Sequence, residues 1–234
     1  TNKMNTITVK SNGKEYSLPI RDDADASVAA EIFKEREYRL AEPIITSASA
    51  PVLDIGAHAG FFSLYARSLN PSVKIVAVEP EPNNFELLKK TLAENDVKNV
   101  EVVKAALSSK TGNRKLIISV DSHNHRLLAP GESDTSKESI SVYTYSLSDL
   151  MKKCIITNVS LLKLDIEEGE YEAFESITPA DLQKIDAIIM EYHLRGGRKL
   201  EKIETKLRES KFGVQVFPSR FDKTMGFLFA KSKR

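Results

Sequence analysis

The sequence predicts an α/β fold built on a mainly parallel sheet. From residue 51 onward, apolar strands alternate with amphipathic helical stretches at regular spacing, which is the pattern of β-α-β units. Near the C-terminus, Val214–Phe217 and Gly226–Ala230 are β-prone and are joined by a loop too short for a crossover helix. These two segments should therefore pair antiparallel and close the sheet with a hairpin.

Residues 1–45 are expected to form a lead-in that packs on the main domain, which we assign to residues 46–234. Two short β-prone runs flank Asn12-Gly13, a dipeptide that strongly favours a hairpin turn. Ser27 is expected to cap a helix that ends before Pro43. The lead-in is thus predicted to be a small hairpin followed by one helix.

The main domain contains five runs that are apolar on both faces, as buried parallel strands are. These predicted strands are Val52–Ile55, Lys74–Val78, Val100–Leu107, Leu161–Asp165 and Ala187–Glu191. Helices are predicted between them, where apolar residues recur on one helical face. The residues that mark these faces are Phe62, Tyr65 and Leu69, then Phe85, Leu88 and Leu92, and later Leu200, Ile203 and Leu207.

Residues 121–139 interrupt this alternation with a polar, turn-rich segment between the β-prone pieces Lys115–Val120 and Ile140–Tyr145. A loop of this length is a candidate substrate lid, with a surface insertion as the alternative. Within it, His123 and His125 fit solvated turn residues better than groups that close over a substrate.

Composition excludes several classes of protein. Hydrophobic residues make up 41% and charged residues 29% of the 234 residues, which fits neither a disordered nor a fibrous chain. No apolar run reaches the roughly 18 residues that cross a bilayer, and the first 20 residues lack the order of a signal peptide. We therefore expect a cytoplasmic protein without a membrane span. Cys154 is the single cysteine, so an internal disulfide is excluded and a structural zinc site is disfavoured.

The net charge of +1 conceals an asymmetry along the chain. Residues 195–234 carry 12 of the 34 Lys and Arg and 4 of the 33 Asp and Glu, a net charge of +8 that leaves −7 on the rest. Such a basic segment could attract nucleic acid. The pattern of Arg198, Lys199, Lys202 and Lys206 is more typical of the solvated side of an amphipathic helix.

A ligand site is predicted where the first strand of the main domain ends. A glycine-bearing turn from Gly56 to Gly60 follows the strand and leads into a helix, so the backbone can approach a ligand closely. Glu79 ends the next strand, 19 residues after Gly60, where a carboxylate can accept hydrogen bonds from both ribose hydroxyls of a nucleoside. These positions indicate a nucleoside-containing cofactor.

His58 disfavours NAD as the cofactor, and Asp54, just before the turn, is a second unusual residue. His58 stands where the dinucleotide fingerprint requires glycine, and its side chain would crowd the pyrophosphate. Asp54 lies inside an apolar strand, where a carboxylate is costly to bury unless it organises the turn or a ligand.

Two sequence stretches, DIGAHAGFFSL and VAVEPEPNNFELL, resemble the class I S-adenosylmethionine-dependent methyltransferases. The later motifs LKLDIE, EYE and MEYH resemble more narrowly the FkbM-type methyltransferase family, and the resemblance runs from about residue 6 to the C-terminus. It implies a seven-stranded Rossmann-like sheet whose last strand is antiparallel. It also implies S-adenosylmethionine as the cofactor.

The resemblance assigns parts of that cofactor to particular residues. Asp54, Gly56 and Gly60 would line its methionine end, and His58 lies in the same turn. Glu79 would bind its ribose, and Ala105 or Ala106 would lie beside its adenine.

This chain departs from the family pattern at two places. The family often has Asn at position 58 and a Gly-Ala pair at positions 168 and 169, where this chain has His58, Glu168 and Gly169. The second departure adds charge beside a predicted strand end.

Catalytic candidates follow the fourth and fifth predicted strands, which are neighbours in such a sheet. His193 is the first choice for a general base, because its reference pKa suits proton abstraction at neutral pH. Asp165 is expected to orient the base or to replace it, and Glu191 lies close by. We assign no metal, although these three residues could together hold a divalent ion. Lys163 and Glu167 are explained nearly as well by a structural ion pair.

The leading functional hypothesis is an S-adenosylmethionine-dependent methyltransferase. The resemblance implies methylation of an oxygen on a sugar, a glycan or another small metabolite. An RNA methyltransferase that uses the basic C-terminal segment is the alternative. A cofactor-binding module without catalysis and a nicotinamide oxidoreductase are weaker hypotheses.

Overall fold

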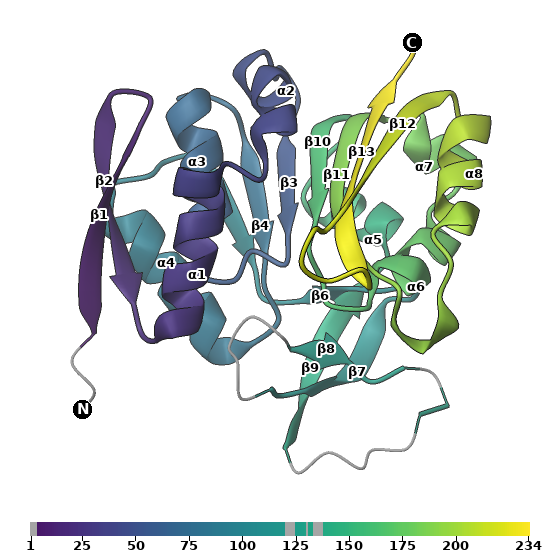
Figure 1. The fold of residues 1–234 in the computed structure, drawn as a ribbon, viewed down its shortest axis with the longest axis horizontal. Coiled ribbons are helices and arrows are strands. Elements are labelled where there is room, and N and C mark those ends of the chain that lie inside the picture. The colour runs from purple at the N-terminus through teal and green to yellow at the C-terminus, as the bar shows by residue number, and fades with distance from the viewer. Residues whose placement is uncertain (1–3, 120–124, 130, 133–137) are drawn as a thin grey trace.

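A seven-stranded sheet forms the centre of the protein, with the strand order β12-β13-β11-β10-β3-β4-β5 (Figure 1). The structure is a computed structural model that describes residues 4–119, 125–129, 131–132 and 138–234. The strands are β3 (Val52–Ile55), β4 (Ile75–Val78), β5 (Val100–Val103), β10 (Val159–Leu164), β11 (Ile185–His193), β12 (Phe212–Pro218) and β13 (Met225–Ser232). Only β13 pairs antiparallel with its two neighbours, so the predicted Rossmann-like sheet with an antiparallel last strand is confirmed.

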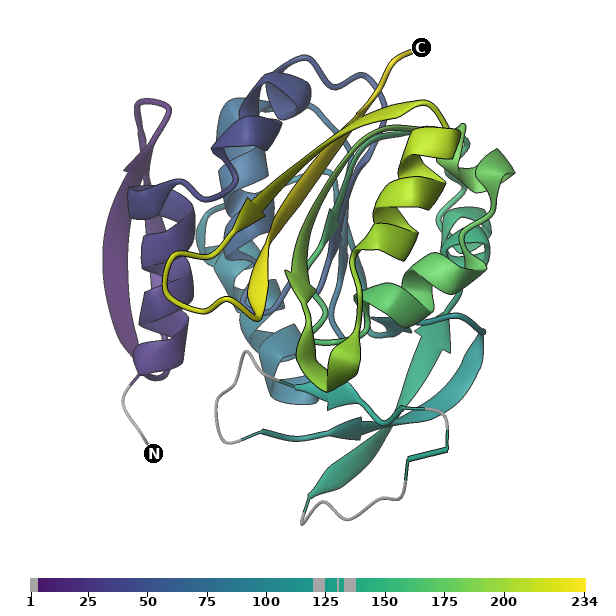
Figure 2. The ribbon, with the colours of Figure 1, turned by 45° about the vertical axis from the view of Figure 1, so that its right-hand side comes forward.

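Helices cover both faces of this sheet, because successive side chains of a buried strand point to opposite sides. On β3, Val52 packs in one apolar core, whereas Leu53 and Ile55 pack in the other. The first core is covered by α1 (Asp23–Ala30), α2 (Glu42–Thr46), α3 (Phe61–Leu69) and α4 (Pro82–Glu94). The second is covered by α5 (Leu147–Lys153), α6 (Glu170–Ser176), α7 (Pro179–Leu182) and α8 (Glu201–Glu209), as the rotated view shows (Figure 2).

The lead-in begins with the predicted hairpin, β1 (Asn5–Ser11) and β2 (Lys14–Ile20). Asn12 and Gly13 form its turn with φ values of 47° and 78°, the left-handed conformation that a tight hairpin favours. Leu18 of this hairpin is fully buried in the same core as Leu64 of α3. The hairpin therefore packs on the main domain, while the division of the chain after residue 45 stays a prediction.

The helix of the lead-in begins earlier than predicted. Asp22, and not Ser27, is its cap, because the Asp22 side chain accepts a hydrogen bond from the backbone N–H of Asp25 at 2.9 Å. Ser27 lies inside α1. After α1 the chain continues as a π-helical turn, Glu31–Glu35, and a short 3-10 turn, Arg39–Ala41.

The predicted strand Val100–Leu107 is wrong as one element. It breaks after β5, where the N–H of Ala105 turns back to the carbonyl of Val103 at 3.0 Å. The next two residues, Ala106 and Leu107, form β6 in a different sheet. Alternating apolar residues cannot reveal such a turn, because both halves are strands.

That second sheet has the order β6-β9-β7-β8 and lies below the central sheet in Figure 1. It consists of β6 (Ala106–Leu107), β7 (Gly112–Ile117), β8 (Arg126–Leu127) and β9 (Ser139–Tyr145). The two β-prone pieces beside the long loop therefore pair with each other. Residues 121–124, 130 and 133–137 of the loop, and so His123, lie outside the described residues.

Among the residues that the structure describes, no helix is both long and apolar enough to cross a membrane. The cytoplasmic location stays a prediction.

Candidate active site

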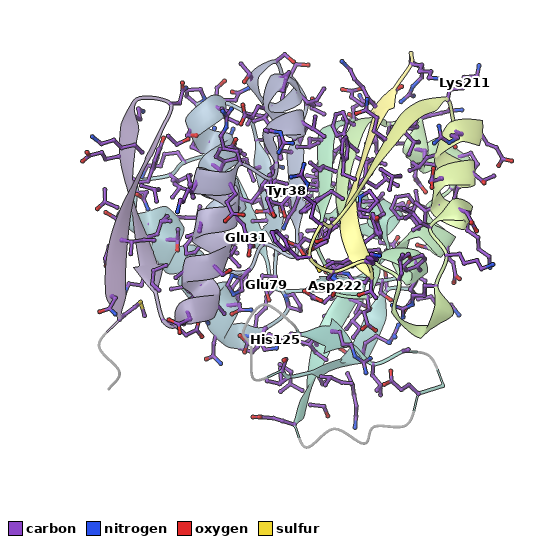
Figure 3. All side chains as sticks on the ribbon, viewed as in Figure 1. Glu31, Tyr38, Glu79, His125, Lys211 and Asp222 are labelled. Carbon is purple, nitrogen blue, oxygen red and sulfur yellow. The ribbon has the colours of Figure 1, made fainter. Side chains whose placement is uncertain are left out.

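A cavity of about 380 Å³ lies at the carboxyl ends of β3, β4, β10 and β11. Its size is within the range of small-molecule sites, and its position is where ligands bind in open α/β sheets. One wall comes from the lead-in, through Glu31 and Tyr38. The opposite wall comes from the second sheet, and Figure 3 shows Glu31, Tyr38, Glu79 and His125 gathered in this region.

The predicted cofactor turn follows β3 and lines the cavity through Gly56, Ala57 and His58. Gly56 has a φ of 76°, and a Cβ atom there would lie 1.7 Å from the carbonyl oxygen of Asp165. Only glycine fits this close approach between two strand ends. The turn is held from the other side, because the N–H groups of Gly56 and Ala57 both donate to the carbonyl of Val78 at 3.0 Å.

Gly60 and Asp54, two of the predicted cofactor residues, are not among the residues that line the cavity. Gly60 starts α3 with a φ of 80°, and a Cβ atom there would lie 2.5 Å from Leu88 Cδ1, so its smallness serves helix packing. Asp54 is fully buried and accepts a hydrogen bond from the Ser63 hydroxyl at 2.6 Å.

Lys163 is the ionic partner of Asp54, at 3.2 Å, and is itself only 2% exposed. It also donates to the carbonyl of Gly56 at 2.7 Å and lies 3.6 Å from the Asp165 carboxylate. Burial lowers the pKa of Lys163, but the charges of Asp54 and Asp165 outweigh burial and raise it overall. Lys163 therefore pairs with Asp54 and not with Glu167 as expected. Its hydrogen bond to the Gly56 carbonyl fixes the turn.

Glu79 lies at the end of β4, is 5% exposed and faces the cavity. Its carboxylate accepts hydrogen bonds from the N–H of His58 at 2.8 Å and of Glu81 at 2.9 Å. The Asn84 side chain donates a third hydrogen bond to this carboxylate, which leaves one of its about four lone-pair positions for a ribose hydroxyl. Burial is the main reason that the pKa of Glu79 rises to about 7. Ala105 and Ala106 also line the cavity, and their place beside the adenine stays a prediction.

An ionic network behind His58 was not predicted from the sequence. Arg21 binds the fully buried Asp25 at 2.8 Å and donates to the Asn84 side chain at 2.8 Å. His58 Nε2 lies 3.4 Å from Asp25 and 3.3 Å from Arg21. The lead-in thus holds the cofactor turn in place through the side chains of Arg21 and Asp25.

The three predicted catalytic residues all line the cavity. Asp165 follows β10, and its side chain is 30% exposed. It accepts a hydrogen bond from the Tyr38 hydroxyl at 3.1 Å and interacts with Glu191. Burial and the charge of Asp165 raise the pKa of Glu191 well above its usual range.

His193 is 4% exposed, and its ring is held by carboxylates on both sides. Nδ1 lies 3.0 Å from Glu170 Oε1, and Nε2 lies 3.5 Å from Glu167 Oε2. Burial lowers the pKa of His193, but the hydrogen bond to Glu170 and the nearby carboxylates outweigh burial and raise it. Carboxylates therefore hold the ring from both sides.

Glu167 and Glu168 adopt left-handed conformations, with φ values of 42° and 64°. Left-handed backbone is uncommon for such residues and is typical of functional sites. Glu168 stands where the family pattern has glycine, and it is held by Arg198 at 3.5 Å. The turn directs Glu167 into the cavity wall.

Sequence reasoning missed the groups that the lead-in contributes, namely Glu31, Glu37 and Tyr38. Burial and the charges of neighbouring carboxylates raise the pKa of Glu37 to about 7. His125, expected to be a solvated turn residue, instead lines the cavity and accepts a hydrogen bond from the N–H of Ser119 at 3.0 Å. The sequence did not reveal these residues as site residues, because the docking of a distant segment against the cavity leaves no local sequence pattern.

Charge is distributed unevenly around the cavity. The described lining includes the carboxyl groups of Glu31, Glu37, Glu79, Asp165, Glu167 and Glu191, but Lys163 is its one lysine or arginine. Part of the basic C-terminal segment lies elsewhere: Lys211, just after α8, is far from Glu79 in Figure 3, whereas Met225 and Phe227 of the same segment line the cavity. On α8 itself, Ile203 and Leu207 are buried and Lys202 is exposed, as in the amphipathic helix predicted.

Comparison with known proteins identifies the family. The model of the methyltransferase FkbM domain matches residues 54–214. Methyltransferase sdnD of Sordaria araneosa is 24% identical over 212 residues, which cover 79% of this chain and 80% of that protein. The 31-O-demethyl-FK506 methyltransferase FkbM of Streptomyces tacrolimicus is 26% identical over 191 residues, which cover 70% and 72%.

A solved structure supports the fold. The methyltransferase FkbM from Methylobacillus flagellatus superposes with a TM-score of 0.55 at 15% identity. The match covers 78% of this chain but 43% of that one, so the chain spans less than half of that protein. Together with the family match over residues 54–214, these similarities show that the chain belongs to the FkbM methyltransferase family.

Proposed function

We propose that the protein is an S-adenosylmethionine-dependent O-methyltransferase whose acceptor is a hydroxyl of a sugar, a glycan or another small metabolite. The observation that carries this proposal is one cavity with two different ends. Glu79 and the Gly56 turn form a nucleoside-binding end, and Asp165, Glu191 and His193 form a carboxylate-rich end. The name of the Streptomyces relative, an O-demethyl-FK506 methyltransferase, supports oxygen as the methylated atom.

The cofactor fits the residues present at the nucleoside end. The Glu79 carboxylate is buried, faces the cavity and has a lone pair left for a ribose hydroxyl. Gly56 provides backbone without a side chain in the wall, and Ala105 and Ala106 leave room for a flat base. When bound, S-adenosylmethionine supplies an activated methyl group with its own leaving group.

The remaining task of the protein is to align the acceptor and to receive its proton. The Asp165 carboxylate is partly exposed to the cavity, whereas the His193 ring is already held by Glu170 and Glu167. We therefore place proton acceptance on Asp165, which reverses the order expected from the sequence. Tyr38 and Lys163 position this carboxylate from two sides.

The RNA alternative is less well supported by the charges around the cavity. A wall with six carboxyl groups repels a phosphate backbone, because neutralisation by Lys and Arg is what holds nucleic acid. The basic α8 region lies away from Glu79 (Figure 3).

Transfer of a tritiated methyl group tests the proposal. The protein is incubated with labelled S-adenosylmethionine and, in parallel, with pools of sugars, glycans, small hydroxylated metabolites and tRNA. We expect base-stable label in a small hydroxylated product, and Asp165→Asn should abolish it while S-adenosylhomocysteine (SAH) still binds. Label recovered in ribonuclease-sensitive material, lost steeply as salt rises, would instead establish the RNA alternative.

A further inference from the structure

Three potential metal ligands converge at the carboxylate-rich end of the cavity. One ligand atom each of Glu167, Glu191 and His193 lies within 4.8 Å of the other two. Glu191 and His193 are two residues apart on β11, so their side chains point to the same face of the sheet. Glu167 reaches them from the turn after β10. Side chains from three different backbone positions thus converge on one point.

The His193 ring has the arrangement of a metal-binding imidazole. Its Nδ1 is held at 3.0 Å by Glu170, a fully buried carboxylate that is not part of the three-residue cluster. Metal-bound histidines commonly donate their other ring N–H to a carboxylate, which fixes the tautomer. Nε2 makes no hydrogen bond to any residue in the described part of the chain, and it faces Glu167 at 3.5 Å. A buried imidazole nitrogen is therefore aimed at the cluster.

The spacing of the three groups suits an octahedral ion. Ligands at about 2.1 Å from such an ion lie about 3.0 Å apart when adjacent and about 4.2 Å apart when opposite. The observed separations, 3.5 Å for one pair and at most 4.8 Å for all, need only small side-chain movements to reach these values. The excess of carboxyl groups around the cavity also favours a cation there.

We infer that Glu167, Glu191 and His193 bind a divalent cation with mixed oxygen and nitrogen ligands, such as Mn²⁺, beside the methyl-transfer site. Two carboxylates and one imidazole leave open positions for oxygen atoms of a ligand. This inference rests on the proposed function for its chemical role, but the binding of the ion does not depend on it.

The chemical role follows from the weak acidity of alcohols. An alcohol is about as weak an acid as water, and the pKa of water falls to about 7 when water binds a catalytic zinc ion. An acceptor hydroxyl bound to the cation would pass its proton to Asp165. Its oxygen would then form a bond to the methyl carbon as the carbon–sulfur bond breaks, and the sulfur would keep the electron pair as a neutral thioether.

Electron paramagnetic resonance of Mn²⁺ tests the site without any acceptor. Free Mn²⁺ is titrated against the whole protein, alone and loaded with SAH. We expect one ion per chain, and Glu167→Gln, Glu191→Gln and His193→Gln should each weaken binding by at least tenfold. Glu170→Gln should weaken it by about 10–100-fold through the loss of ring orientation. Glu175→Gln, which removes an exposed charge elsewhere on α6, should leave binding unchanged.

Two results would overturn the inference. One is the absence of Mn²⁺ binding up to millimolar concentration in protein that binds SAH, which would leave the proposed function intact. The other is binding that none of the cluster variants changes, which would place the ion elsewhere. Mn²⁺ binding without any SAH binding would support the metal site and contradict the proposed cofactor, so the two failures are distinguishable.

Discussion

Replacing Lys163 by methionine should destabilise the protein strongly, because the change leaves the Asp54 carboxylate buried without its cation. Lys163 is 2% exposed and Asp54 fully buried, and their charged atoms are 3.2 Å apart. Breaking a buried pair by removing one partner costs about 3–5 kcal/mol. For a chain of this length, each kcal/mol lowers Tm by about 2–4 °C, so the expected loss is about 6–20 °C.

Urea unfolding and thermal unfolding measure this loss, and two further variants control it. Lys89→Met removes a lysine paired with Glu86 at 3.0 Å on the exposed surface, and should cost less than about 1 kcal/mol. The double variant Asp54→Asn with Lys163→Met removes both charges and should recover more than half of the loss. A Lys163→Met protein as stable as Lys89→Met would refute the reasoning.

Three further predictions concern the cofactor end of the cavity. Because the Glu79 carboxyl group has a pKa of about 7, its ionised fraction and the affinity for SAH should fall about tenfold from pH 8 to pH 6. Calorimetry of Glu79→Gln should show no such dependence over that range. Gly56→Ala should abolish SAH binding, since its Cβ would lie 1.7 Å from a backbone oxygen, whereas Gly213→Ala, with its nearest atom at 3.4 Å, should bind normally. Arg21→Met removes a contact to the ring of His58 and should weaken SAH binding by about 1 kcal/mol, or about fivefold; equal affinity would show that the network behind the turn is dispensable.

The central sheet could be predicted because its strands are apolar on both faces and its connections are regular. The antiparallel hairpin at the C-terminus followed from a loop too short for a crossover. Val100–Leu107 was predicted as one strand and is two, because the turn at Ala105 is set by tertiary pairing with β9 and not by a local breaker.

The cavity could be predicted in part for a related reason. Strand ends on one edge of a parallel sheet meet, so Glu79, Asp165 and Glu191 were placed correctly by topology alone. The sequence could not predict in the same way to which group a side chain inside a strand points. Asp54 was correctly expected to be buried, but only the structure shows that it faces Lys163 and not the cavity.

Calorimetric titration of the protein with S-adenosylmethionine, SAH and NAD tests the central claim most directly. We predict that the first two bind once per chain at micromolar strength and that NAD does not bind. Glu79→Gln should weaken both interactions while leaving the folded state intact. Folded protein that binds neither methyl-donor ligand, or that binds them equally well without the Glu79 carboxylate, would contradict the account.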